Sequence, residues 1–493
     1  MSYYLLAIDQ GTTNSRAILF NHCGELQSHH ALPLRQSFPQ PGWVEQDPLE
    51  MVNNVINCCR KVIKENLIPL KKIAALGISN QRETTILWNR INGQPIYPAI
   101  VWQDRRTLEL CHKISTMPIS RDLQQKTGLL LDPYFSLTKI IWIFANVPIA
   151  HRLAERGELL FGTVDSYLLW QLSGGKVHAT DATNAARTLM FNINTQTWDS
   201  DILQAFSIPV SILPQVLDNA TYFGNIDASI LGASIPIMGM AGDQQAAGIG
   251  QACFYPGMLK ATYGSGGFLL LNIGQNFRQS RHRLLTTTYY RLNKQVTYGL
   301  EGSIFAAGTV IKWLRDNLHL LQTVAESATL ASSVNSTEGV YFIPAFTGLG
   351  APYWNAKVRA TISGLTFNSG RAQIIRAALE SIGYQTFALI EVMQSEQKLE
   401  FNKLRVNGAM TSNNWLMQFL ADLLNLTVFQ PQCIECTALG AAYLAGLGVG
   451  IYKSIEDISN LWQQRTVFKP QMSELMRKDL YRGWQAAVQR LTN

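Results

Sequence analysis

The sequence predicts an α/β protein built from two lobes. Strand-like and helix-like segments alternate along the whole chain, which is the pattern of mixed α/β domains. A glycine turn between two apolar, strand-like runs occurs near the N-terminus, and a second turn of this kind follows in the middle of the chain. The length of 493 residues leaves room for two large domains. We therefore assign residues 1–248 to an N-terminal lobe and residues 249–493 to a C-terminal lobe.

The composition is that of a globular chain with more than one core. Hydrophobic residues make up 47% and charged residues 15%, which excludes disorder for the bulk of the chain. The net charge of +7 suits small anionic substrates and does not indicate a nucleic-acid partner. Seven scattered cysteines indicate free thiols in a reducing, cytoplasmic setting. The longest uncharged apolar stretch, residues 437–452, is too short for a membrane span and predicts a buried helix.

The N-terminal lobe is predicted to begin with a strand hairpin. Residues 3–8 and 17–20 are apolar and flank the polar turn at residues 9–14. Because this turn joins strand to strand, it differs from the P-loop and Rossmann turns, which lead into a helix, and neither of those motifs occurs in the chain. No secretory signal is expected, because the N-terminus lacks a basic region.

Further elements follow from local signals. Asp47 and Pro48 predict a helix over residues 48–65, as cap and first residue. Strands are predicted over residues 73–79 and 86–88, and a helix over residues 134–144.

The C-terminal half contains a second set of signals. The small, glycine-rich residues 239–250 predict a flexible stretch. Residues 260–271 predict a strand, a glycine turn and another strand. A helix is predicted over residues 415–424, with Asn413 as its cap.

The first glycine turn has the chemistry of a phosphate-binding loop. Gly11 predicts a left-handed, tight backbone, and Asp9 supplies a hard oxygen for Mg²⁺, through water. The side chains that suit phosphate oxygens are Thr12, Thr13, Asn14 and Arg16. An ordinary polar hairpin is the alternative interpretation.

Two later turns offer complementary surfaces. Residues 262–267, with Gly264 and Ser265, form a second possible anion nest, and two nests facing each other would hold one nucleotide from both sides. Residues 407–409 precede Asn413 and a helix, which favours a flat floor for a purine. Common glycine hairpins and a plain strand–turn–helix corner are the alternatives.

A dispersed set of residues suits a small polyol. Arg82 and Glu83 are adjacent after a strand, and they form either a surface ion pair or a grip in which arginine donates to a hydroxyl and glutamate accepts from one. The rings of Trp102 and Tyr134 would cover the carbon side. Asp243, in its glycine-rich setting, is the candidate general base.

With these motifs in order, the chain closely resembles the FGGY carbohydrate kinases over essentially its whole length. The motif NQRETT is typical of the members that act on glycerol rather than on xylulose or gluconate. The segments that carry the resemblance are DQGTTNSRA (9–17), PGWVEQDP (41–48), GISNQRETT (77–85), DPYFSLTKIIW (132–142), GELLFGTVD (157–165), GDQQAA (242–247), FTGLGAPYW (346–354) and CTALGAAYLAG (436–446).

The resemblance implies two actin/hexokinase-like (ribonuclease H-like) lobes with a central nucleotide and substrate cleft. It implies ATP and Mg²⁺ as cofactors and phosphorylation of glycerol to sn-glycerol 3-phosphate, the first step of glycerol catabolism. It also implies a homo-oligomer, a dimer or a tetramer. Two alternatives stay open: a kinase for another small polyol or ketose, and a nucleotide or glycerol sensor with weak turnover.

The resemblance also assigns residues by position. Asp243 corresponds to the general base, and Asp9 and Asp243 to the metal-linked carboxylates. The substrate positions are Arg82, Glu83, Trp102, Tyr134, Asp243, Gln244 and Phe268. The nucleotide positions are Thr12, Thr13, Asn14, Arg16, Gly264, Ser265, Gly308, Lys312, Gly408, Ala409 and Asn413.

The chain departs from the family pattern in and beside its nucleotide positions, including residues 265–267, which replace a commoner Thr-Gly-Cys or Thr-Gly-Thr. Asn407 stands where aspartate is usual, Ala409 where glycine is usual, and Lys312 where glutamine is frequent. A methyl group at Ala409 is expected to crowd the adenine floor or to strain the turn. Residues 227–235 contain no basic residue, so inhibition by a sugar bisphosphate is expected to be absent.

Overall fold

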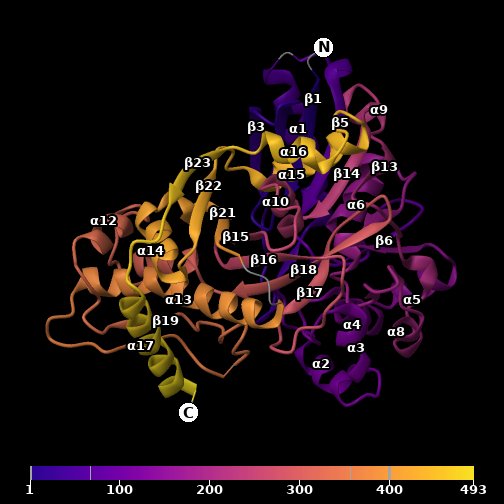
Figure 1. Ribbon diagram of the computed structural model, residues 1–493. Helices are drawn as coiled ribbons and strands as arrows, with labels where there is room; N and C mark the ends of the chain where they lie inside the picture. The colour runs from indigo at the N-terminus through magenta and orange to yellow at the C-terminus, as the bar shows by residue number, and fades with distance from the viewer. Residues whose placement is uncertain (1–2, 67, 356, 398–400, 493) are drawn as a thin grey trace.

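The computed structural model describes residues 3–66, 68–355, 357–397 and 401–492, and it contains two large sheets, one in each half of the chain (Figure 1). In spatial order, the N-terminal sheet consists of β13 (Ala220–Asn225), β14 (Pro236–Gly242), β5 (Ile73–Asn80), β1 (Tyr4–Gln10), β2 (Asn14–Asn21) and β3 (Leu26–Pro33). In spatial order, the C-terminal sheet consists of β17 (Leu285–Leu292), β18 (Gln295–Ile304), β16 (Gly267–Gly274), β15 (Leu259–Tyr263), β21 (Lys403–Asn407), β22 (Thr427–Pro431) and β23 (Gln464–Phe468). Helices alternate with these strands, so the predicted α/β class is confirmed.

The two sheets share one topology. In each, three strands are antiparallel neighbours: β1, β2 and β3 in the first, and β15, β16 and β18 in the second. Two further strands then pair in parallel on the other side, β5 and β14 in the first sheet and β21 and β22 in the second. This is the pair of ribonuclease H-like lobes that the resemblance predicts. The two glycine turns therefore occupy equivalent places, between the first two strands of each lobe.

Helix α1 (Pro48–Glu65) forms where the sequence predicts it. Proline is its first residue, and the Asp47 carboxylate accepts a hydrogen bond from the Leu49 backbone N–H at 2.9 Å. This bond satisfies one of the backbone donors that a helix start leaves unpaired. In the described part of the chain, no helix combines the length and the hydrophobicity that crossing a bilayer requires. The other helices are α2 (Leu108–Ser115), α3 (Ser120–Thr127), α4 (Ser136–Asn146), α5 (Ile149–Glu155), α6 (Val164–Leu172), α7 (Ala182–Ala185), α8 (Ser200–Ala205), α9 (Ala228–Leu231), α10 (Asp243–Gly250), α11 (Gly308–Asp316), α12 (Glu326–Ser332), α13 (Arg371–Gln397), α14 (Asn414–Leu424), α15 (Cys436–Gly448), α16 (Ile455–Leu461) and α17 (Glu474–Thr492).

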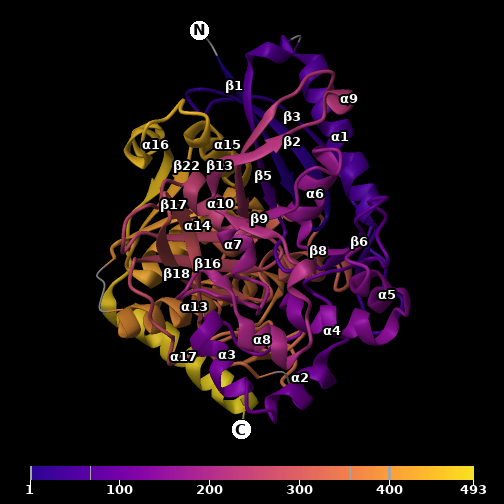
Figure 2. The ribbon, with the colours of Figure 1, turned by 90° about the vertical axis from the view of Figure 1, so that its right-hand side faces the viewer.

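Between β5 and β13 the chain forms an insert of short elements. In Figure 2, α2, α3, α4 and α8 gather below the strands β1, β2 and β5. The insert carries Trp102 and Tyr134, and α4 begins two residues after the predicted start at Tyr134. The short strands outside the two large sheets are β4 (Glu45–Gln46), β6 (Ile86–Asn89), β7 (Ala99–Ile100), β8 (Leu159–Gly162), β9 (Ala179–Asp181), β10 (Phe191–Asn192), β11 (Thr197–Trp198), β12 (Gln215–Leu217), β19 (Tyr341–Ile343) and β20 (Thr361–Ser363).

A helix from the C-terminal half packs on the N-terminal sheet. Helix α15 contacts β1, β5, β14 and α10, and Figure 1 shows it, in yellow, beside the indigo and magenta strands. The backbones approach so closely that a Cβ at Gly77 would lie 2.0 Å from the Ala441 carbonyl oxygen, and one at Gly440 would lie 1.8 Å from that of Ala246. The predicted buried helix is thus confirmed. The predicted flexibility of residues 239–250 is wrong, because these small residues end β14 and form α10, where they fit against α15.

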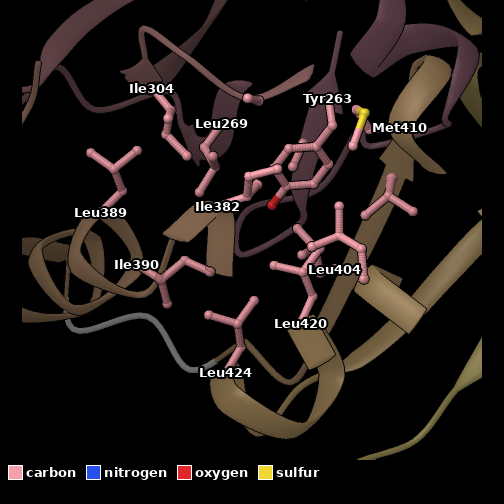
Figure 3. Packing of buried hydrophobic residues seen from close by; sticks show 14 of the residues in the cluster. Tyr263, Leu269, Ile304, Ile382, Leu389, Ile390, Leu404, Met410, Leu420 and Leu424 are labelled. Carbon is pink, nitrogen blue, oxygen red and sulfur yellow. The ribbon is translucent and has the colours of Figure 1, made fainter. Parts of the chain in front are cut away.

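The core of the C-terminal lobe anchors the second glycine turn. Tyr263, the last residue of β15, is buried, and its hydroxyl lies 3.0 Å from the Thr386 hydroxyl on α13. The turn at residues 264–266 therefore starts from a fixed point in a close-packed core. The apolar side chains labelled around Tyr263 in Figure 3 are Leu269, Ile304, Ile382, Leu389, Ile390, Leu404, Met410, Leu420 and Leu424.

Candidate functional site

The first glycine turn is held from several sides. The Gly11 backbone N–H donates to the Asn14 carbonyl oxygen at 3.0 Å and closes the hairpin. The carbonyl oxygen of Thr12 accepts from the Gln46 side chain, and that of Thr13 accepts from the Leu34 backbone N–H, just after β3, at 2.9 Å. The prediction of a left-handed backbone at Gly11 is wrong, because Gly11 is not among the residues with positive φ. A Cβ at this position would lie 3.4 Å from the Asn14 carbonyl oxygen, in ordinary contact.

Two carboxylates hold Arg16 behind this turn. Asp9 faces it across the β1–β2 pair at 3.0 Å, and Glu435, just before α15, lies 2.7 Å from its other amino group. Burial raises the pKa of Asp9 to about 6; Arg16 acts to lower that pKa, while Glu435 and Asp243 act to raise it. The guanidinium predicted to meet phosphate oxygens is therefore already paired. Glu435 was not predicted from the sequence.

The carboxylates of Asp9 and Asp243 could supply part of the coordination of a hard divalent cation. Asp243 acts to raise the pKa of Asp9, and a cation beside Asp9 would oppose that effect. Among the described residues, no group of three or more histidine, cysteine, aspartate or glutamate side chains is arranged to hold a metal ion. Mg²⁺ usually keeps several waters and binds substrate phosphates beside one or two carboxylates, which these two residues fit.

The second turn lies directly against the start of α11. The Gly308 backbone N–H donates to the Gly264 carbonyl oxygen at 3.0 Å, and the Thr309 backbone N–H donates to that of Ser265 at 3.2 Å. A Cβ at Gly308 would lie 2.7 Å from the Gly264 carbonyl oxygen, so the contact requires glycine. Lys312 is exposed on α11, one turn beyond Gly308. The structure thus brings together three of the predicted nucleotide positions, with a cation one helical turn away.

The third turn approaches the same place. Gly408 has a φ of 98°, and a Cβ there would lie 2.5 Å from the Tyr263 carbonyl oxygen, one residue before the second turn. Ala409 has no positive φ, so the backbone strain expected there is absent, and the left-handed position of the turn is Gly408, which adopts it without a Cβ clash. Asn413 caps α14, as predicted: its side-chain oxygen accepts from the Leu416 backbone N–H at 3.0 Å.

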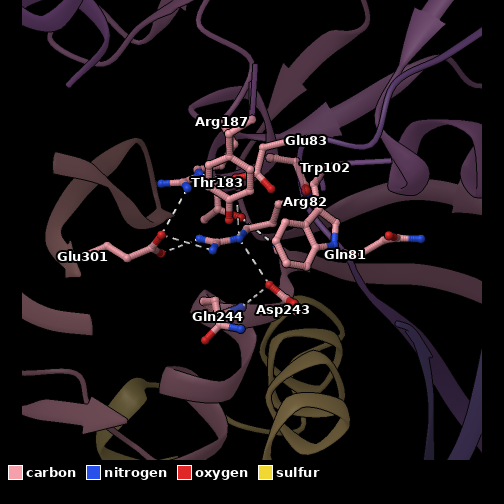
Figure 4. Close-up of polar contacts among 12 residues, drawn as sticks. Gln81, Arg82, Glu83, Trp102, Thr183, Arg187, Asp243, Gln244 and Glu301 are labelled. Carbon is pink, nitrogen blue, oxygen red and sulfur yellow. Dashed lines mark hydrogen bonds and ion pairs between the residues drawn. The ribbon is translucent and has the colours of Figure 1, made fainter. Parts of the chain in front are cut away.

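Arg82 and Glu83 lie in the interior of the molecule. Their side chains are 2% and 1% exposed, so the surface ion pair is excluded. The Arg82 Nε lies 3.2 Å from Asp243, and both of its terminal nitrogens contact Glu301 on β18, at 2.6 Å and 3.2 Å (Figure 4). Glu301, which comes from the other lobe, was not predicted from the sequence. Arg82 is therefore oriented by carboxylates from both halves of the chain.

The backbone at Glu83 is strained and held in place. Its φ is 61°, an unusual value for a residue other than glycine, and one that often marks a functional site. Its carbonyl oxygen accepts hydrogen bonds from the hydroxyls of Ser136 at 3.0 Å and Thr85 at 3.1 Å. Its carboxylate accepts from the Nε of Arg187, a second residue that the sequence analysis missed, at 2.5 Å. These contacts fix the carboxylate beside Arg82.

Three aromatic rings form a cluster next to this charged pair. The Trp102 ring centroid lies 5.6 Å from that of Tyr134 and 6.4 Å from that of Phe268, on β16. The Trp102 indole N–H also donates to the Thr12 hydroxyl at 2.9 Å. One indole therefore contacts the first glycine turn, the insert and the strand that follows the second turn. Burial raises the pKa of Tyr134, so its hydroxyl stays protonated.

Asp243 begins α10 and is the accessible carboxylate of this group. Its side chain is 32% exposed, and its Oδ1 accepts from the Gln244 backbone N–H at 2.7 Å. Gly242 precedes it because a Cβ there would lie 2.6 Å from the Arg82 side chain. Gln244 is buried, and its side-chain oxygen accepts from Lys260 at 2.6 Å. This arrangement suits a carboxylate that takes a proton from a small hydroxyl compound.

Two of the residues that were not predicted share a signal that the sequence contains. Glu301 is the one charged residue in its strand, β18, and Lys260 is the one charged residue in β15. A lone charge inside an apolar strand predicts a buried partner, because an unpaired buried charge is costly.

Two family models together match most of the chain. Residues 4–250 match the N-terminal domain of the FGGY family of carbohydrate kinases, and residues 259–449 match its C-terminal domain. The glycerol kinase of Coxiella burnetii (strain Dugway 5J108-111) is 55% identical over 491 residues, covering 99% of this chain and 98% of that protein. The glycerol kinase of Ectopseudomonas mendocina is 53% identical, covering 100% of this chain and 99% of that protein.

Solved structures give the same result. Plasmodium falciparum glycerol kinase with ADP superposes with a TM-score of 0.93 at 38% identity, covering 99% of this chain and 98% of that chain. Gluconate kinase from Lactobacillus acidophilus has a TM-score of 0.86 at 19% identity, covering 98% of this chain and 96% of that chain, and supports the fold alone. On these matches and on the paired ribonuclease H-like lobes, the chain belongs to the FGGY family of carbohydrate kinases.

Proposed function

We propose that this protein is an ATP-dependent glycerol kinase that forms sn-glycerol 3-phosphate. The observation that carries the proposal is the accessible Asp243 carboxylate, 3.2 Å from the buried Arg82, with Glu83 and an aromatic cluster alongside. Full-length relatives at 53–55% identity are named glycerol kinases, and the related Plasmodium structure contains ADP. Both facts support glycerol and ATP as the substrates.

The polar and aromatic groups divide the recognition of glycerol between them. Arg82 donates to a hydroxyl and Glu83 accepts from one, while Trp102, Tyr134 and Phe268 cover the carbon chain. Because both groups are buried, a substrate lacking a hydroxyl leaves one of their remaining hydrogen-bonding positions unfilled, which is costly even though Glu301 and Arg187 still pair with them. This explains a preference for a polyol over a simple alcohol.

The transfer step needs positioning more than a strong base. The terminal hydroxyl oxygen of glycerol forms a bond to the γ-phosphorus, the bond from that phosphorus to the β-phosphate oxygen breaks, and the hydroxyl proton passes to Asp243. The turns at residues 11–14, 264–266 and 408–409 hold the nucleotide. Asp9 and Asp243 would hold Mg²⁺, which neutralises phosphate charge when bound.

Further features of the proposal come from the family resemblance. We propose residues 1–248 and 249–493 as the lobes that approach each other around the substrates. The seven cysteines are free thiols, which supports a cytoplasmic enzyme. We also propose that the protein forms a homo-oligomer, either a dimer or a tetramer.

A coupled assay of ADP release with glycerol, ATP and Mg²⁺ tests the function. The wild-type protein should turn over, and Asp243→Asn should lower kcat by about 10²–10⁴-fold while largely sparing glycerol binding. Asp479→Asn, on the distant α17, is the matched control and should match the wild-type protein. Retained turnover in Asp243→Asn would refute the role of that carboxylate, and equal activity on glycerol and a pentulose would favour the broader polyol or ketose kinase.

A further inference from the structure

A lysine is buried in the middle of the site. Lys260 lies on β15 and its side chain is inaccessible to solvent. A buried ammonium needs compensating hydrogen bonds, and Lys260 makes two: to the Gln244 side-chain oxygen at 2.6 Å and to the Thr262 hydroxyl at 2.9 Å. Burial lowers the pKa of Lys260 to about 8, although Asp243 and Glu301 act to raise it. Lys260 has no role in the proposed transfer step.

The direction of these hydrogen bonds is fixed, because an ammonium group donates and cannot accept. The side-chain oxygen of Gln244 must therefore face Lys260, so the amide nitrogen of Gln244 points away from it. The Thr262 hydroxyl accepts from Lys260 and gives its own hydrogen to the Asn407 side-chain oxygen at 2.8 Å. The amide nitrogen of Asn407 is in turn directed away from Thr262.

The two ends of this chain of hydrogen bonds lie in different parts of the site. Gln244 follows Asp243 on α10, in the proposed glycerol half. Asn407 ends β21, in register with Thr262, and directly precedes Gly408 of the proposed nucleotide half. The link also crosses the lobes, since α10 lies in the N-terminal family domain and β15 and β21 lie in the C-terminal one.

We infer that Lys260 is a positioning residue that sets the orientation of two amides at once, Gln244 beside glycerol and Asn407 beside the nucleotide. The assignment of the two halves rests on the proposed function. Because one ammonium fixes both amides, loss of its charge affects both substrates, whereas loss of the Thr262 hydroxyl affects the nucleotide half alone.

The test combines kinetics with ADP binding measured by calorimetry. Lys260→Met should raise the KM for glycerol and the Kd for ADP by roughly tenfold each, which is the loss of one strong hydrogen bond to a charged group. Thr262→Val should raise the Kd for ADP by about fivefold and leave the KM for glycerol within about twofold of wild type. Thr262→Ser, which keeps the hydroxyl, should recover most of the lost ADP affinity. Lys403→Met removes an exposed lysine from the neighbouring strand and is the control.

Two results would overturn the inference. One is a folded Lys260→Met protein with wild-type glycerol KM and ADP affinity. The other is a Thr262→Val protein that binds ADP like the wild type, or in which both substrates weaken equally. If Lys260→Met fails to fold, the two Thr262 variants decide the question. If the wild-type protein does not phosphorylate glycerol, the proposed function is wrong. The ADP measurements would still test whether Lys260 orients Asn407.

Discussion

The contact between Glu301 and Arg82 gives the sharpest prediction. Glu301→Gln keeps the size and the hydrogen-bonding atoms of the side chain and removes its charge. In the wild-type protein this carboxylate contacts Arg82 twice, at 2.6 Å and 3.2 Å, and lies 3.1 Å from Arg187. The variant therefore leaves two buried guanidinium groups with one carboxylate fewer. We expect Arg82 to pair more strongly with Asp243, the accessible carboxylate that remains beside it.

The size of the effect follows from the electrostatics of the pair. Burial acts to raise the pKa of Glu301, but Arg187 and Arg82 outweigh it and lower that pKa to about 2. Relative to its ordinary value of 4.5, this corresponds to roughly 3 kcal/mol in favour of the charged form. That stabilisation is present above pH 4.5 and is lost as the pH falls toward 2. Breaking one buried partnership typically costs a similar amount.

We expect part of this free energy to be lost from the catalysed reaction, as a lower kcat/KM for glycerol. If the orientation of Arg82 depends on Glu301, kcat/KM for glycerol should fall by up to about 100-fold in Glu301→Gln, because 1.4 kcal/mol corresponds to a factor of ten. Binding of ADP should change by less than about threefold, since Glu301 touches none of the proposed nucleotide residues. The measurements are steady-state kinetics with glycerol varied, ADP calorimetry and urea unfolding.

Glu380→Gln provides the matched control. Glu380 is also a buried carboxylate of the C-terminal lobe, paired with Arg376 at 2.9 Å and with the Tyr384 hydroxyl at 2.8 Å on α13. This variant should lose stability and keep kcat/KM. If Glu301→Gln behaves in the same way, with kcat/KM within about threefold of wild type, the contact is purely structural and the reasoning is refuted.

Three further predictions test separate parts of the structure. Burial lowers the pKa of His178 to about 4, so the wild-type free energy of unfolding should fall by about 3 kcal/mol between pH 7 and pH 4 relative to His178→Gln, measured by urea unfolding. Because burial raises the pKa of Asp9 to about 6, kcat/KM for ATP should fall as the pH drops below about 6. Asp9→Asn should have a low kcat/KM for ATP at every pH, with no further fall below pH 6. Gly440→Ala places a Cβ 1.8 Å from the Ala246 carbonyl oxygen, so the free energy of unfolding should fall by about 1–3 kcal/mol, and an unchanged urea midpoint would contradict the packing of α10 on α15.

The elements predicted correctly are those whose signals are local. The cap and proline of α1, the hairpin of β1 and β2, the Asn413 cap and the uncharged run of α15 each depend on neighbours in the sequence. Residues 239–250 misled the prediction because small residues serve close packing as well as flexibility. A Cβ at Gly248, for example, would lie 2.1 Å from the Tyr289 hydroxyl oxygen. Only the partner surface distinguishes the two cases.

The charged partners of the site could not be predicted from neighbouring residues, because they lie far away in the sequence. Arg82 and Glu83 are visible as an adjacent pair, but Glu301 is 219 residues from Arg82, and Glu435 is 419 residues from Arg16. The family resemblance assigns residues by position and therefore transfers the groups that touch substrate. It does not transfer the groups that orient these proposed substrate residues. Lone charges in apolar strands are the signal that would have found Glu301 and Lys260.

The long-range pairs have one property in common that bears on how the enzyme works. Arg82 with Glu301, Gln244 with Lys260, and Arg16 with Glu435 each join the N-terminal half to the C-terminal half. Each lobe supplies a glycine turn by the same topology, but each of these three pairs takes one side chain from each lobe. A displacement of one lobe would therefore disturb the proposed contacts of glycerol and of the nucleotide together. On the proposed function, such coupling would let Asp243 meet both substrates only when the lobes are together and water, the competing acceptor, is excluded.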